Sequence, residues 1–103
     1  MAWYELAVPA TDPQEGAVHA CLAAGVPILL VGNEGRWWGI EDRCSHADCS
    51  FSTDGEVDGL VVICNCHGSE FDVRTGAVLA APATDPLRVL PLRRTAGRLE
   101  VEL

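Results

Sequence analysis

Short apolar runs alternate with turn-forming residues along the whole chain. Dipeptides that favour turns, such as Asp12-Pro13, Asp58-Gly59 and Asp85-Pro86, recur every few residues and leave little room for helices. Apolar and β-branched runs bounded by such turns are typical of strands. We expect strands at residues 3–8, 17–22, 27–31, 36–41, 60–64, 70–73, 77–79, 87–92 and 99–103. Many short strands predict an all-β fold, a small antiparallel β-barrel or sandwich.

Three local patterns refine this prediction. The last strand, residues 99–103, alternates apolar and acidic residues, which is typical of a half-buried antiparallel strand. Asn33-Glu34-Gly35 lies between two apolar runs and predicts a hairpin loop. Strand side chains point alternately to opposite faces, so one of Trp37 and Trp38 should face outward.

Chain length and charge narrow the classes of function. With 103 residues the chain is long enough for one domain, residues 1–103, and too short for two. The net charge is −8 and all seven basic residues are arginine, which argues against nucleic acid and anionic membranes as partners, because both require a basic face.

The longest nearly apolar run, residues 20–32, is too short for a membrane-spanning helix. The N-terminus lacks a basic and an apolar segment, so we expect a cytoplasmic protein.

Most of the cysteine and histidine side chains fall in two clusters, Cys44-Ser45-His46-Ala47-Asp48-Cys49 and Cys64-Asn65-Cys66-His67-Gly68-Ser69. Each cluster follows a predicted strand, so two loops at strand ends could face each other. Five cysteines in a cytoplasmic chain indicate metal or redox chemistry before structural disulfides.

Three metal sites are compatible with these residue types. A zinc site would use Cys44, Cys49, Cys64 and Cys66 or a mixture of cysteine and histidine, although the spacing within each pair suits zinc poorly. A plant-type [2Fe–2S] site needs four thiolates at a different spacing. The third site takes one thiolate and one imidazole from each loop, in the pattern Cys44-x-His46 and Cys64-x-x-His67.

This third pattern resembles the signature of the Rieske [2Fe–2S] family. The similarity continues in His67-Gly68-Ser69-Glu70-Phe71-Asp72, in Arg74-Thr75-Gly76, in the turn at residues 55–59 and in Ala81-Pro82-Ala83, which corresponds to the proline loop of the family. By motif it covers roughly residues 36–92. The resemblance implies a Rieske-type barrel with a two-loop cluster-binding subdomain at about residues 42–84.

The resemblance also assigns ligands. It implies one [2Fe–2S] cluster whose metal and cofactor ligands are Cys44, His46, Cys64 and His67, with the two cysteines on one iron and the two histidines on the other. Because neutral imidazole replaces thiolate on one iron, such clusters have reduction potentials of about −150 to +300 mV.

Four further positions correspond to features of the high-potential members of the family. Cys49 and Cys66 lie where those members carry a disulfide between the loops; the alternative is two free thiols. Ser69 matches a serine whose hydroxyl bonds a bridging sulfide, although it could equally be a polar turn residue. Phe71 stands where a tyrosine often donates to a cysteine sulfur, so we expect an intermediate or low potential within the Rieske range.

The function implied by the resemblance is that of a free-standing Rieske-type ferredoxin. It would carry single electrons from a flavoprotein ferredoxin reductase to a terminal oxygenase, with an aromatic-ring-hydroxylating dioxygenase as client. We expect a monomeric component of an enzyme system and no catalytic residues in the chain itself. The alternatives are a Rieske subunit of a larger oxidoreductase, similar to a nitrite-reductase small subunit or an arsenite oxidase, and a zinc-bound structural module.

Charge is concentrated around the first loop. Residues 41–58 carry six acidic side chains and one arginine, a net charge of −5. This stretch could be an ordinary solvated face. It could also steer the protein toward a basic patch on a partner, an effect that speeds association and weakens with salt.

Overall fold

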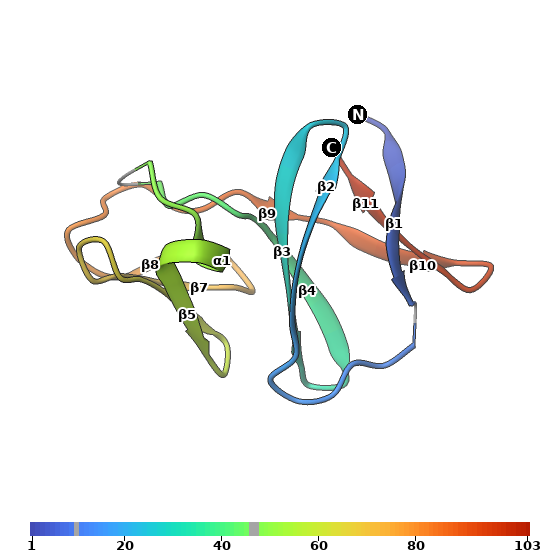
Figure 1. The fold of residues 1–103 in the computed structure, drawn as a ribbon, viewed down its shortest axis with the longest axis horizontal. Coiled ribbons are helices and arrows are strands. Elements are labelled where there is room, and N and C mark those ends of the chain that lie inside the picture. Colours follow the sequence, from blue (N-terminus) through green and yellow to red (C-terminus); the bar gives the residue numbers. More distant parts are fainter. Residues whose placement is uncertain (10, 46–47) are drawn as a thin grey trace.

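The structure of the protein is a computed structural model that describes residues 1–9, 11–45 and 48–103. In chain order the elements are β1 (Trp3–Pro9), β2 (Val18–Ala23), β3 (Val26–Asn33), β4 (Arg36–Glu41), α1 (Phe51–Asp54), β5 (Gly55–Asp58), β6 (Val61–Cys64), β7 (Ser69–Asp72), β8 (Val78–Ala80), β9 (Val89–Leu90), β10 (Leu92–Thr95) and β11 (Arg98–Glu102). These strands form three antiparallel sheets, ordered β1-β11-β10, β2-β3-β4-β9 and β5-β6-β7-β8 (Figure 1). Within the described ranges no helix is long and apolar enough to cross a membrane.

The first two sheets, which we call the body, enclose one apolar core. The buried residues of this body core are Leu6, Val8, Ala23, Ile28, Leu30, Leu90, Leu99 and Val101. Strands β1 and β11 supply theirs in register, with Leu6 opposite Leu99. The acidic neighbours Glu100 and Glu102 are half-buried on the other face. The alternation predicted for the last strand is therefore confirmed.

The third sheet, which we call the loop-bearing sheet, packs on the opposite side of the second sheet. Its core contains Leu29, Val31, Ile40, Cys44, Phe51, Val62, Cys64, Phe71, Val73, Ala83 and Leu87. The rings of Phe51 and Phe71 meet edge to face with centroids 5.8 Å apart, which joins α1 to β7. Figure 1 shows this sheet and α1 at the left, on the side away from both chain termini.

Strand β3 contributes to both cores. Ile28 and Leu30 point into the body core, whereas Leu29 and Val31 point toward the loop-bearing sheet. All four side chains are fully buried. A strand that is buried on both faces must be apolar at consecutive positions, which explains the unbroken apolar run in the sequence.

The central position of the second sheet corrects the prediction for the tryptophan pair. Neither Trp37 nor Trp38 faces outward as an exposed ring; both are half-buried, because each face of β4 is covered by a different core. Trp37 packs on the body core and Trp38 on the loop-side core. Alternation alone could not reveal that both faces of this sheet are covered.

The other strand predictions are confirmed with small shifts of their ends, and there are three differences. Residues 51–54 form the short helix α1, and residues 55–58 form strand β5 where only a turn was expected. The strand expected at residues 87–92 is divided into β9 and β10 at Pro91, whose ring removes a backbone donor. The hairpin at Asn33-Glu34-Gly35 is confirmed: Glu34 and Gly35 have φ of 57° and 72°, the left-handed pair of a two-residue hairpin turn.

Candidate metal centre

Two loops carry the clustered cysteines. The first loop, residues 42–50, connects β4 to α1, and the second loop, residues 65–68, connects β6 to β7 within the loop-bearing sheet. Figure 1 shows both loops at the left-hand end of the molecule. The topology therefore brings together segments that are about one fifth of the chain apart, as the prediction of two facing loops required.

Backbone hydrogen bonds fix the shape of each loop. In the first loop, Cys44 N–H donates to the carbonyl of Cys49 over 2.9 Å. In the second, Gly68 N–H donates to the carbonyl of Cys64 over 2.8 Å, and Gly68 has a φ of +83°, which L-residues with a side chain rarely adopt. Asn65 N–H donates to the carbonyl of Asp54 over 2.8 Å, which ties the second loop to the end of α1.

A buried carboxylate anchors the beginning of α1 next to the first loop. Asp42 is only 5% exposed and accepts hydrogen bonds from both the backbone N–H (3.1 Å) and the hydroxyl of Ser52. The backbone N–H groups in the first turn of a helix have no partner within the helix, and here a side chain from the preceding loop supplies one. This contact positions α1 and Phe51 against the core beneath the loops.

The thiols of Cys44 and Cys64 meet at the base of the two loops. Both side chains are buried, with exposures of 3% and 1%, and they are within hydrogen-bonding reach of each other. Burial raises the pKa of the Cys64 thiol, and the neighbouring Cys44 thiol raises it further. A cation between the two sulfurs would reverse this balance, because metal-bound thiols lose their proton.

The backbone of the second loop acts in the opposite direction on Cys64. The N–H groups of Cys66 and His67 point at its sulfur and lower its pKa. Hydrogen bonds from amides to cysteine sulfur are among the features that set the reduction potentials of iron–sulfur clusters. The sequence suggested these amides only through the small residues of the loop, since their direction depends on the turn itself.

Cys49 and Cys66 are joined by a disulfide that links the first loop to the second. The sulfurs of Cys49, Cys64 and Cys66 all lie within 4.8 Å of one another. Because two of these three sulfurs are bonded to each other, only the Cys64 sulfur is available as a thiolate. The zinc site built from four cysteines would require this disulfide to be reduced.

Of the two histidines in the predicted ligand pattern, the structure describes only His67. His67 is exposed in the second loop and its backbone N–H faces Cys64. His46 lies outside the described residues. The geometry thus places Cys44, Cys64 and His67 in one region, with the two thiols buried at the base of the loops and His67 exposed in the second loop.

A third segment, residues 81–86, closes the site. Ser69 is fully buried, and its hydroxyl accepts a hydrogen bond from the N–H of Ala83 over 3.0 Å, so it holds the proline loop to β7. The hydroxyl of Ser45 donates to the carbonyl of Asp85 over 2.6 Å, which ties the same segment to the first loop. The contact between Ser45 and Asp85 could not be predicted from the sequence, because two residues that are 40 positions apart leave no local pattern.

Residues 2–91 match the family model described as "Rieske [2Fe-2S] domain". The chain belongs to the Rieske [2Fe–2S] family. The predicted resemblance is therefore confirmed, and so is the predicted cofactor type, one Rieske [2Fe–2S] cluster.

Relatives and solved structures agree on the kind of Rieske protein. The ferredoxin component of the p-cumate 2,3-dioxygenase system of Pseudomonas putida is 34% identical over 93 residues, 89% of this chain and 79% of the relative. The ferredoxin subunit of the 3-phenylpropionate/cinnamic acid dioxygenase of Escherichia coli (strain K12) is 35% identical over 98 residues, 84% of this chain and 92% of the relative. The chain is thus a Rieske ferredoxin of the dioxygenase-system type, an electron-transfer component.

Solved structures extend the comparison to the fold. A chain in a complex of reduced oxygenase and oxidized ferredoxin of carbazole 1,9a-dioxygenase superimposes with a TM-score of 0.83 at 31% identity, covering 96% of this chain and 91% of that one. The ferredoxin of carbazole 1,9a-dioxygenase from Nocardioides aromaticivorans IC177 gives a TM-score of 0.76 at 25% identity, covering 92% and 97%. The three antiparallel sheets therefore form the Rieske fold.

The described residues fit a Rieske cluster by their chemistry. Two thiols from different loops are buried together, and amide N–H groups are directed at one of them. A histidine lies at the exposed tip beyond them. A Rieske [2Fe–2S] group requires thiolate on one iron and imidazole on the other, and two buried thiols with an exposed histidine match that requirement.

Proposed function

We propose that Cys44, His46, Cys64 and His67 hold one [2Fe–2S] cluster and that the protein carries single electrons from a flavoprotein reductase to the terminal oxygenase of a ring-hydroxylating dioxygenase. The observation that carries this proposal is the burial of Cys44 and Cys64 against each other below an exposed His67. When bound, the cluster stores one electron reversibly. The cluster-binding part would then be about residues 42–84, within a single domain of residues 1–103.

The protein's own residues have three tasks in this function. The core under the loops, with Phe51 and Phe71, keeps water away from the sulfur ligands. The amides of Cys66 and His67 stabilise negative charge on the Cys64 sulfur. An exposed histidine at the tip would give the electron a short path to a partner that docks there.

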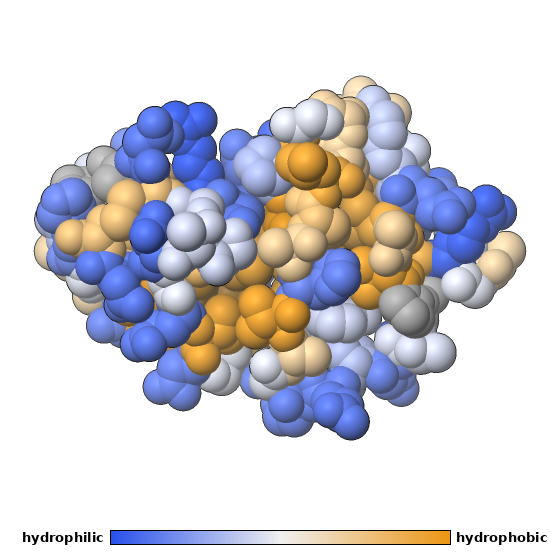
Figure 2. Space-filling view, viewed as in Figure 1, coloured by the Kyte–Doolittle hydropathy of each residue, from blue (hydrophilic) through white to orange (hydrophobic). Residues whose placement is uncertain are grey.

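The surface around the loops is suited to brief encounters. Asp48, Asp54, Glu56 and Asp58 are exposed, and Figure 2 shows hydrophilic side chains over most of the loop-bearing end. Asp42, in contrast, is buried and belongs to the scaffold. We infer that the exposed carboxylates steer the protein toward basic surfaces, which favours fast association over a small interface.

The relatives support the oxygenase as a partner. The names of the P. putida and E. coli relatives place those proteins in aromatic dioxygenase systems, and one matching structure is a complex of an oxygenase with its ferredoxin. We propose the same kind of oxygenase partner here, with a reductase as electron donor and with all three proteins in the cytoplasm. We also propose that the protein is a monomer. Sizing of the purified protein and cell fractionation test these two points.

A redox titration followed by EPR tests the ligand assignment. The reduced protein should give the rhombic spectrum of a Rieske cluster and a midpoint potential between about −150 and +300 mV. His67→Cys should lower that potential or abolish the cluster, because thiolate adds negative charge. An unchanged spectrum and potential in His67→Cys would show that His67 is not a ligand. Reduction by a flavoprotein reductase and re-oxidation by an oxygenase then test the carrier role separately.

One observation favours a second candidate function. The disulfide between Cys49 and Cys66 is a feature that the resemblance associates with high-potential Rieske subunits. The chain could accordingly be a permanent subunit of a larger oxidoreductase. Such a subunit would elute with its complex from unfractionated native extract, whereas a free carrier would elute alone at the size of the monomer.

A further inference from the structure

Asp42 is a buried carboxylate at the start of the first loop, two residues before the proposed ligand Cys44. It is 5% exposed, and it is the only buried side chain with a charge in the part of the chain that the structure describes. Its backbone N–H donates to the carbonyl of Pro27 over 2.9 Å, which holds the start of the loop against β3. Two residues of chain span at most about 7 Å, so Asp42 lies close to the thiols at the base of the loops.

The hydrogen-bond donors to the Asp42 carboxylate are neutral. Its two oxygens accept from the backbone N–H of Ser52, over 3.1 Å, and from the Ser52 hydroxyl. These donors fix the position of the carboxylate, but they bring no positive charge to it. A buried charge with neutral partners acts strongly on its neighbours, because little solvent lies between them.

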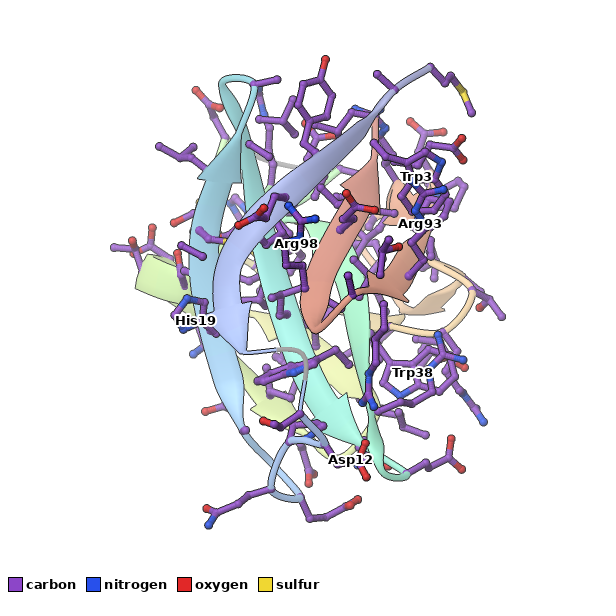
Figure 3. The ribbon with its side chains drawn as sticks, turned by 90° about the vertical axis from the view of Figure 1, so that its right-hand side faces the viewer. Trp3, Asp12, His19, Trp38, Arg93 and Arg98 are labelled. Atoms are coloured by element: carbon purple, nitrogen blue, oxygen red, sulfur yellow. A yellow bond between two sulfur atoms is a disulfide. The ribbon has the colours of Figure 1, made fainter. Side chains whose placement is uncertain are left out.

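The arginines of the chain pair with other carboxylates. Six of the seven form ion pairs with described residues, and none of these pairs includes Asp42. Figure 3 looks at the end of the molecule opposite the loops and shows two of these arginines, Arg93 and Arg98, there. Arg43 lines the same cavity as Asp42 but pairs with Asp48 over 2.8 Å, and both of those side chains are more than half exposed. Within the described ranges, the charge of Asp42 is thus not paired with a cation.

A fixed negative charge near the metal centre changes the energy of reduction. Reduction adds one electron, and hence one unit of negative charge, to the cluster. Like charges repel more strongly where the effective dielectric constant is low, so a buried carboxylate raises the free energy of the reduced state. The amides of Cys66 and His67 act in the opposite direction, because they stabilise negative charge on the Cys64 sulfur.

We propose that Asp42 is a potential-determining residue, which lowers the reduction potential of the cluster through its buried charge, and that Ser52 fixes the carboxylate for this role. The inference rests on the proposed cluster site and deepens it. The cluster takes up one electron, and the carboxylate neither binds iron nor transfers a proton. Together with Phe71, which has no donor for a cysteine sulfur, Asp42 favours a potential in the lower part of the Rieske range.

The variant Asp42→Asn separates the charge of this residue from its shape. The oxygen of the asparagine can accept from the Ser52 N–H, and its nitrogen can donate to the Ser52 hydroxyl, so both contacts can remain. Without the charge, the equilibrium constant for one-electron reduction should rise about tenfold, which corresponds to about 59 mV. Redox titration followed by EPR, at fixed pH and on the cluster-loaded protein, measures this potential.

Asp54→Asn is the matched control for charge. Asp54 is exposed at the end of α1, so this substitution removes the same charge from a solvated position that lines the same cavity. The equilibrium constant for reduction should change by less than about twofold. At high salt the effect of Asp42→Asn should persist, because buried charges are screened little, whereas the effect of Asp54→Asn should vanish.

Ser52→Ala is the control for structure. It removes the hydroxyl contact but leaves the carboxylate charged. If Asp42 acted only by holding α1 in place, Ser52→Ala would change the potential as Asp42→Asn does. We expect no rise in potential, because a carboxylate that loses a donor keeps its full charge.

A substitution at the surface covers the case in which Asp42→Asn does not fold. Thr53 is exposed on α1 and lines the same cavity as Asp42. Thr53→Lys should bring a cation to the carboxylate and raise the potential, at high salt as well as at low salt. Thr53→Gln is similar in length but neutral, and it should leave the potential unchanged.

The EPR spectrum and the iron and sulfide content keep the two proposals apart. Unmodified protein that gives no Rieske spectrum would refute the proposed function itself. Where that spectrum is present, the inference is overturned if Asp42→Asn does not raise the potential, or if Asp54→Asn or Ser52→Ala raises it equally. If Asp42→Asn does not fold, equal potentials in Thr53→Lys and Thr53→Gln overturn the inference.

Discussion

The body and the loop-bearing sheet differ in what holds them together. The body core consists of aliphatic side chains, and the strands that carry them pair over four to six residues, except β9, which pairs with β4 over two. The loop-bearing sheet has strands of three or four residues, and its core includes the thiols of Cys44 and Cys64. A disulfide and the hydrogen bonds of Asp42, Ser45 and Ser69 fasten its loops.

In this small domain the body provides most of the apolar burial, and the loop-bearing sheet provides the functional site. Strand β3 is shared, with Leu30 in one core and Leu29 in the other, so the body provides a rigid wall for the loops. A chain of this size buries a limited fraction of its surface, and short strands alone would hold the loops poorly. Covalent and metal bonds at the functional end supply what apolar burial cannot provide there.

The largest expected effect is loss of the cluster in Cys64→Ser. The serine keeps the shape of the side chain but is a poor ligand for iron, so iron and acid-labile sulfide should fall to near zero and the visible absorption should disappear. Cys21→Ser is the matched control, because Cys21 is half-buried beside the body core and should not affect iron content. Full iron content in purified Cys64→Ser would contradict the proposed ligand set.

Core substitutions should distinguish the two regions by what they change. Leu30→Ala should lower the free energy of unfolding by about 2–5 kcal/mol while leaving the EPR spectrum as it is, because Leu30 faces only the body core. Phe71→Ala should cost about 3–5 kcal/mol and also broaden the spectrum, since Phe71 supports α1 and β7 under the loops. Denaturant unfolding and EPR on each variant measure both effects. Identical spectra in the two variants would mean that the loop-side core does not shape the metal centre.

Removal of the disulfide should affect lifetime more than assembly. In the variant Cys49→Ser with Cys66→Ser the cluster should still assemble, because the proposed ligands remain. The disulfide closes a sequence separation of 17 residues, for which chain entropy predicts a loss of about 3 kcal/mol. The decay of visible absorption in air should therefore be faster than in the unmodified protein. Cluster loss as complete as in Cys64→Ser would instead identify one of the pair as a ligand.

Most of the strands and both loops could be predicted from the sequence, and the features that could not be predicted have physical explanations. The strands and the loops could be predicted because alternation, turn residues and cysteine spacing are local patterns. Helix α1 could not, because its four residues include the turn-favouring Ser52 and Asp54, and their helical conformation depends on the distant carboxylate of Asp42. Local patterns also gave no sign that both faces of β4 are covered.

The metal centre shows the same division. The family pattern names Cys44, Cys64 and His67 as ligands, which stays a prediction, and the loop disulfide lies at the two positions that the pattern named. The amide N–H groups that point at Cys64 depend on the turn at Gly68, and the clamp from Ser45 to Asp85 depends on how the chain returns to the loops. Contacts of this kind are properties of the folded topology and not of any short segment.

A smaller effect is expected from Ser69→Ala. The Ser69 hydroxyl accepts from Ala83 and retains its own proton, which the family resemblance directs to a bridging sulfide. Loss of one hydrogen bond worth about 1 kcal/mol to the reduced state lowers a one-electron potential by about 40 mV. Ser45→Ala is the control, because that hydroxyl donates to the carbonyl of Asp85 and has no proton left for the cluster. Equal potentials in the two variants would show that Ser69 serves only to hold the proline loop.

The smallest effect concerns the exposed carboxylates near the loops. Glu56→Gln with Asp58→Asn removes two negative charges from β5, so the association rate with a reductase should fall about threefold at low ionic strength. The difference should vanish at high salt, because screening lengths shrink to about 3 Å at 1 M. Stopped-flow reduction of the cluster at several salt concentrations measures this dependence.

Matched substitutions in the body test whether the change in association rate depends on where the charges lie. Glu15→Gln with Glu34→Gln removes the same net charge from exposed positions outside the loop-bearing sheet. If steering comes from the surface around the loops, this control should change the association rate less than the β5 variant does. If both variants slow association equally, net charge alone is responsible, and the carboxylates near the loops have no special role in directing the encounter.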